Sequence, residues 1–120
     1  MSAGNATAHF GAAKSRLSLV GHTHLQLVVW RDAEGNIGGR RPQRGEVVEL
    51  DTWEGHQICV NPGGAGQPRD GDPLAPYAVL DTESNEVQFY RVAYDIAGAQ
   101  RHIMGAGLPV ELANRLEAGR

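Results

Sequence analysis

The amino-acid sequence predicts an α/β fold in which about six short strands, mainly antiparallel, precede two short helices. Short apolar runs alternate with turn residues over positions 17–94, a pattern typical of sheets with short connections. From Asp95 onward, apolar residues instead recur at helical spacing. The 120 residues allow one domain with a single modest core.

The β-rich part of the chain divides into strands and turns. Residues 1–14 are small and polar and contain glycines that weaken a helix, so this N-terminal segment is poorly defined. Turn residues fill 32–36 and 82–85, and glycines, a proline and arginines make 38–44 an expected exposed loop. The predicted strands cover residues 17–20, 25–31, 46–51, 57–61, 77–81 and 86–94.

The end of the chain predicts two short helices. Asp95 is a suitable N-cap for the first, because its carboxylate can accept from the first free backbone N–H groups. Gly105 is a suitable stop for this helix. Pro109 stands where a second helix readily begins.

Charge and composition exclude several classes of function. The chain has 11 basic and 14 acidic residues and a net charge of −3, so no basic excess supports nucleic-acid wrapping. The longest apolar run, residues 25–30, is far shorter than the roughly 20 residues that span a bilayer. Cys59 is the only cysteine, which rules out an internal disulfide and favours a reducing cytoplasm.

The most informative motif is Gly21 followed by His22, Thr23 and His24 at the end of an apolar run. Two residues apart on an extended segment, the imidazoles are expected to point to the same side, with α-carbons about 6.5–7 Å apart. This spacing suits two metal ions about 3.5–4 Å apart, one held by each ring. The alternative interpretation is a pair of half-exposed histidines in a turn.

A second run, residues 61–73, is rich in glycine and proline and is long for a connection inside a compact domain. Asn61 ends a predicted strand, and Gly63 belongs to a tight turn. Arg69 is able to clamp a phosphate oxygen bidentately. The favoured alternative is structural, with Arg69 paired to Asp70 or Asp72 to fix the loop.

Together, the two motifs resemble those of calcineurin-like metallophosphoesterases. Residues 19–25 look like the last metal-binding motif of that family. Residues 61–73 resemble the run that follows it in one bacterial and archaeal, phosphodiesterase-like branch. Three later segments agree in order and spacing, namely residues 77–81, 91–95 and 107–109.

The resemblance implies that residues 1–120 are one partial domain, the C-terminal half of a four-layer α/β/β/α metallophosphoesterase sandwich. It assigns His22 and His24 to two divalent metal ions, one each, with manganese, iron, nickel or zinc as candidates. It gives no residue of this chain a catalytic role of its own, and family members usually have serine in place of Gly64. Support of the substrate or the loop is implied for Gly21, Asn61, Gly63 and Arg69.

The family's earlier motifs, which supply the bridging carboxylates, are not found in this sequence. We therefore expect the intact homologue to hydrolyse a small phosphomonoester, phosphodiester or nucleotide, and this chain alone to be inactive. The strand at 17–21 is expected to have an exposed edge, so the chain should form homo-oligomers or pair with a complementing N-terminal half. Two alternatives remain: a non-catalytic β-rich binding or scaffold module with a relic metal motif, or a truncated reading frame.

Overall fold

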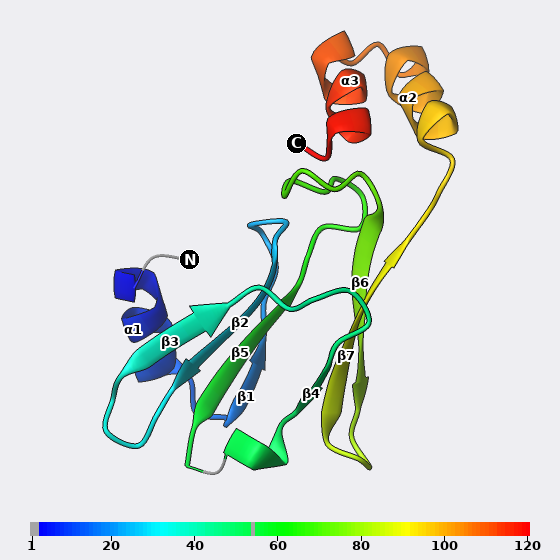
Figure 1. Cartoon of the computed structure of the whole chain (residues 1–120). Coiled ribbons are helices and arrows are strands. Elements are labelled where there is room, and N and C mark those ends of the chain that lie inside the picture. Colours follow the sequence, from blue (N-terminus) through cyan, green and yellow to red (C-terminus); the bar gives the residue numbers. More distant parts are fainter. Residues whose placement is uncertain (1–2, 54) are drawn as a thin grey trace.

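The computed structural model describes residues 3–53 and 55–120, which form two β-sheets, an N-terminal helix and a C-terminal pair of helices (Figure 1). The helices are α1 (Ala3–Ala12), α2 (Ile96–Gly105) and α3 (Val110–Ala118), with a short 3-10 turn, η1, at Asp51–Trp53. The strands are β1 (Leu17–Leu19), β2 (Gln26–Arg31), β3 (Ile37–Arg40), β4 (Val47–Glu49), β5 (Gln57–Pro62), β6 (Ala75–Asp81) and β7 (Glu86–Val92).

The strands form two sheets. The first has the order β1-β5-β2-β3, and the second has the order β4-β7-β6. β1 runs parallel to β5, and all the other pairs are antiparallel. The predicted class, an α/β fold with mainly antiparallel strands and two short C-terminal helices, is confirmed.

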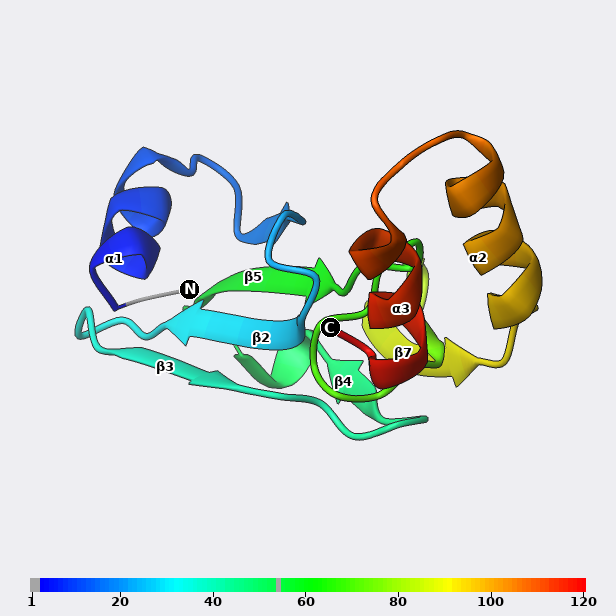
Figure 2. The same cartoon turned by 90° about the horizontal axis from the view of Figure 1, so that it is seen from above.

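The central strands of the first sheet are buried on both faces. Val28 and Val60 point into the core between the sheets, where they meet Phe89 of β7. Val29 and Cys59 point the other way and are covered by α1, which lies on the side of this sheet away from the second sheet (Figure 2). Because successive strand residues alternate faces, the continuous apolar runs of β2 and β5 serve two cores. Burial also raises the pKa of the Cys59 thiol, as expected for a core cysteine.

Two segments differ from the sequence-based expectation. The predicted loop at 38–44 is wrong in its first part, because β3 pairs there with β2. Gly38 lies opposite Trp30, and a Cβ at Gly38 would come within 2.3 Å of the indole, so the ring fills the space that a side chain would need. The segment 1–14, left poorly defined by sequence, contains helix α1, whose Phe10 is buried.

One long side of the sandwich is open. β1 has β5 as its only neighbour in the described part of the chain, and β6 likewise ends the second sheet. An apolar cavity of about 90 Å³ lies between these two edges, and Leu19 beside it is 60% exposed. The exposed edge predicted for the strand at 17–21 is therefore present over Leu17–Leu19.

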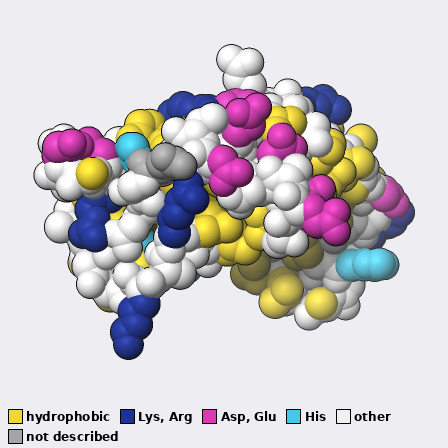
Figure 3. All heavy atoms as spheres, turned by 90° about the horizontal axis from the view of Figure 1, so that it is seen from below, with side chains coloured by type: hydrophobic (Ala, Val, Ile, Leu, Met, Phe, Trp, Pro, Cys, Tyr) yellow, Lys and Arg dark blue, Asp and Glu magenta, His cyan; other side chains and the backbone are white. Residues whose placement is uncertain are grey.

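The helices α2 and α3 lie together beyond the end of the sheets, beside the loop between β5 and β6 (Figure 1). Asp95 caps α2 as predicted, since its Oδ1 accepts from the backbone N of Gly98 at 2.8 Å. Gly71 of the loop donates to the carbonyl of Gly119 at 3.0 Å, which ties the loop to the end of α3. The opposite end, seen from below in Figure 3, mixes acidic and basic side chains.

Candidate metal and phosphate site

The two histidines lie in a turn between β1 and β2 rather than on an extended strand. Both have a left-handed backbone, with φ of 75° at His22 and 59° at His24. Thr23 N donates to the carbonyl of Gly21 at 3.0 Å and closes the turn. The extended geometry predicted for this motif is therefore wrong. Residues other than glycine rarely adopt this conformation, and it persists where the surroundings hold it in place, often at functional sites.

Asn61, near the end of β5, stabilises this turn by hydrogen bonds. Its side chain is buried, and its amide N donates to the carbonyl of Gly21 at 3.0 Å and to Thr23 Oγ1 at 2.9 Å. Its Oδ1 accepts from Gly63 N at 3.0 Å. One asparagine at the end of β5 thus fixes both the histidine turn and the first residues of the following loop.

His24 is oriented by two contacts with that loop. Its Nδ1 lies 2.6 Å from the backbone carbonyl of Gln67. A carbonyl only accepts, so Nδ1 is the donor in this contact, and when the ring is neutral its lone pair is on Nε2. This is the arrangement that metal-binding histidines commonly have. In addition, a Cβ at Gly64 would lie 2.7 Å from His24 Cβ and Cγ, so the glycine makes room for the ring.

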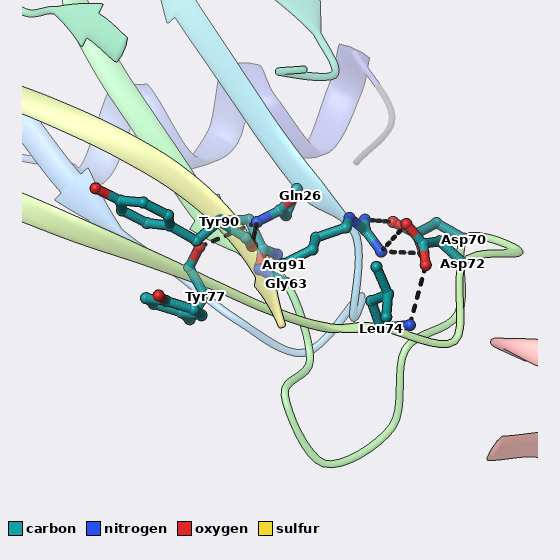
Figure 4. Close-up of polar contacts among 9 residues, drawn as sticks. Gln26, Gly63, Asp70, Asp72, Leu74, Tyr77, Tyr90 and Arg91 are labelled. Atoms are coloured by element: carbon teal, nitrogen blue, oxygen red, sulfur yellow. Dashed lines mark hydrogen bonds and ion pairs between the residues drawn. The ribbon is translucent and has the colours of Figure 1, made fainter. Parts of the chain in front are cut away.

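Gly63 and Gln26 join the start of the loop to the second sheet. Gly63 has a φ of 97°, and a Cβ there would come within 2.8 Å of Pro76 and 3.1 Å of Gln26 Cγ. The buried Gln26 amide donates to the carbonyls of Tyr77 and Tyr90, each at 3.1 Å (Figure 4). The base of the site is therefore fixed by hydrogen bonds and close packing across both sheets.

The far part of the loop is anchored by Arg91 of β7, a residue that the sequence analysis did not single out. Its guanidinium donates from Nη1 to Asp70 Oδ1 at 3.1 Å and from Nη2 to Asp70 Oδ2. Nη1 also lies 3.4 Å from Asp72 Oδ2 (Figure 4). The Arg91 and Asp70 side chains are only 10% and 7% exposed. The expected pairing of Arg69 with these aspartates is wrong, because Arg69 is exposed and donates to Gln67 Oε1 at 2.8 Å.

A sequence signal for Arg91 did exist. In the predicted strand 86–94, the alternation puts Arg91 on the same side as Val87 and Phe89, which are buried. A guanidinium on a core-facing position needs anionic partners. The two aspartates of the glycine-rich loop are the partners that the fold brings to it.

The imidazole of His24 therefore contacts a loop that Asn61 and Arg91 hold in place near its two ends. Within residues 3–53 and 55–120, no group of three or more His, Cys, Asp or Glu side chains is arranged to hold a metal ion. The donor set present consists of His22, which is exposed, and His24, which is half-buried. Neutral imidazoles suit zinc, iron, nickel and copper.

Comparison with known proteins shows what the sequence and the fold of this chain resemble. A solved metallophosphoesterase from Sphaerobacter thermophilus is 41% identical to the chain, with a TM-score of 0.85 over 97% of the chain and 47% of that protein. This chain is similar to part of a metallophosphoesterase over nearly its whole length. The resemblance inferred from the two motifs is thus confirmed, as is the match to part of a metallophosphoesterase fold.

Two further comparisons were made, one with curated proteins and one with protein-family models. An uncharacterized protein of Methanocaldococcus jannaschii is 38% identical over 104 residues, which are 87% of this chain and 40% of that protein. No protein-family model matches the chain. The chain thus spans less than half the length of each of these two proteins. None of the helices within residues 3–53 and 55–120 has both the length and the hydrophobicity of a membrane span.

Proposed function

We propose that this chain contributes part of the active site of a metal-dependent phosphoesterase, with His22 and His24 as ligands to two divalent ions. The observation that carries the proposal is the orientation of His24, whose Nδ1 donates to the Gln67 carbonyl, so that the lone pair of Nε2 stays available to a metal ion. The similarity to a metallophosphoesterase supports it. The substrates proposed are small phosphomonoesters, phosphodiesters or nucleotides.

The residues of the chain have distinct roles in this proposal. Bound divalent ions, whether manganese, iron, nickel or zinc, would supply a hydroxide and neutralise phosphate oxygens. His22 and His24 hold the ions as neutral imidazoles. A Cβ at Gly21 would meet nothing within 4 Å, so Gly21 supports the turn through its carbonyl, which accepts from Asn61 and Thr23. Asn61 keeps the turn in place. Arg69 is exposed on the loop and is free to exchange its contact with Gln67 for a phosphate oxygen.

The remaining ligands are proposed to come from a complementing N-terminal half that docks along the open side of the sandwich. There, β1 has a strand on one side only within the described part of the chain, and Leu19 is 60% exposed and lines an apolar cavity. Such an edge is a ready template for further strand pairing. In this proposal residues 1–120 are one partial domain, inactive alone, and homo-oligomers form when the edge pairs with a second copy.

A cytoplasmic location is part of the same proposal. The single cysteine is buried in the core, and chains without disulfides are typical of reducing compartments.

A chimera tests this function. Residues 15–118 of this chain would replace the matching segment of the Sphaerobacter thermophilus protein, and hydrolysis of bis(p-nitrophenyl) phosphate would be measured with Mn²⁺. We expect turnover that falls about 100-fold or more in His22→Ala and in His24→Ala. The exposed His102→Ala on α2 is the matched control and should keep full activity.

Two results would contradict the proposal. A folded chimera whose activity is unchanged by both histidine substitutions would make the motif a relic in a scaffold module. Hydrolysis of p-nitrophenyl phosphate by the isolated chain, lost in His22→Ala, would show that no complementing half is needed.

A further inference from the structure

An apolar cavity of about 230 Å³ lies between the α2–α3 pair and the glycine-rich loop, and the roles proposed above do not use it. The residues that line it are Gly66, Gln67, Ile103, Leu108, Leu112 and Leu116. None of them is charged, and the only polar side chain among them is the amide of Gln67. The lining therefore favours an uncharged, apolar occupant.

The cavity adjoins the candidate metal site through a shared residue. Gln67 lines the cavity, and its backbone carbonyl accepts the hydrogen bond from His24 Nδ1 at 2.6 Å. Only Gln67 thus separates the cavity from the His24 ring, so a molecule bound at the histidines would have an apolar space next to it.

The walls of the cavity are held in place by hydrogen bonds and burial. Gln100 of α2 donates from Nε2 to the carbonyl of Ala113 in α3 at 3.1 Å. Gly119, just after α3, packs so closely on the loop that a Cβ there would lie 2.7 Å from the backbone of Asp72. Leu116 is buried, whereas Leu108 at the rim is 50% exposed. The cavity is preformed and open to solvent on one side.

We propose that this cavity receives the organic group of the phosphate ester, and that this group is a single aromatic ring or a short alkyl chain. The inference rests on the function proposed above. The cavity is smaller than the roughly 300–1,000 Å³ of sites for drug-sized ligands, which suits one ring. The Gln67 amide is the only side chain of the lining that could form hydrogen bonds with a sugar or a second phosphate. The other polar groups of such a ligand would lose their hydrogen bonds to water, which costs free energy. Aryl and alkyl phosphates are therefore the preferred substrate class over nucleotides and sugar phosphates.

The test uses the whole chain, saturated with Zn²⁺, and follows backbone amide signals by NMR. p-Nitrophenyl phosphate is compared with methyl phosphate, which has the same phosphate group and no ring. We expect p-nitrophenyl phosphate to bind about tenfold more tightly or better, from burial of the ring, and to shift the amides of Leu112 and Leu116.

Two variants remove the apolar wall, and one is a matched control. Leu112→Gln and Ile103→Gln, on different helices, should each abolish the preference for the aryl ester; two variants are used in case one does not fold. Val110→Gln should keep it, because Val110 is on α3, is 49% exposed and does not line the cavity.

Equal binding of the two phosphates would overturn the proposal, as would shifts confined to residues outside the cavity. If zinc still perturbs His22 and His24 in that case, the proposed metal function stands and only the cavity assignment fails. If zinc does not bind the histidines, and p-nitrophenol without zinc still fills the cavity, the cavity is a separate ligand site and the link to phosphate esters is overturned.

Discussion

Removal of the Arg91 guanidinium should strongly destabilise the chain. Arg91→Met keeps most of the side-chain volume but removes the ion-pair partner of the Asp70 carboxylate, which is only 7% exposed. Breaking a buried ion pair by removing one partner costs about 3–5 kcal/mol. Asp70→Asn should cost less, about 1–3 kcal/mol, because Arg91 retains Asp72 at 3.4 Å.

The measurement is urea unfolding followed by circular dichroism, with Arg101→Met as the matched control. Arg101 pairs with Asp95 at 3.7 Å, but those side chains are 67% and 73% exposed, so this loss should cost about 0–1 kcal/mol. The double variant with Arg91→Met and Asp70→Asn should recover part of the loss, because no buried charge is then left alone. A loss in Arg91→Met no larger than that in Arg101→Met would refute the role given to this anchor.

Two further predictions follow from packing in the first sheet. Gly38→Ala should lower the free energy of unfolding by about 1–3 kcal/mol, because the new Cβ would lie 2.3 Å from Trp30, whereas Gly39→Ala, with nothing nearer than 3.5 Å, should be tolerated; equal melting temperatures in thermal unfolding would contradict this. Folded Cys59 should react with a disulfide reagent at pH 8 about 100-fold more slowly than the urea-unfolded chain. Since burial raises the folded pKa of the Cys59 thiol, its contribution to stability is complete below the ordinary thiol pKa. It is lost as the pH rises above that value, so the stability advantage over Cys59→Ala should shrink in that range.

Much of the fold could be predicted because its signals are local. The buried strands β2 and β5 are continuous apolar runs, and the hairpin of β6 and β7 surrounds four turn residues. The strand β3 could not be predicted, because its two glycines disfavour a strand on their own. Only its pairing with β2, where the large Trp30 ring covers Gly38, makes glycine suitable there.

The site could be predicted only where its residues carry chemistry in their own side chains. The type of His22 and His24 and their place in the motif predict metal ligands, and this stays a prediction. The contact that orients His24 is a backbone carbonyl 43 residues further along the chain. Because any residue type offers such a carbonyl, no sequence pattern marks it. The turn that contains both histidines is likewise bonded to the buried Asn61, which only the assembled sheet places next to it.

The central claim is that His22 and His24 are metal ligands and that the fold leaves Nε2 of His24 available. The most direct measurement is a zinc titration of the chain followed through histidine side-chain ¹⁵N signals. Before zinc is added, His24 should be protonated on Nδ1 and not on Nε2. Zinc should then shift Nε2 of His24 together with the ring of His22, and leave the exposed His102 unchanged. A proton on Nε2 of free His24, or a zinc shift at His102 without one in the turn, would contradict the account.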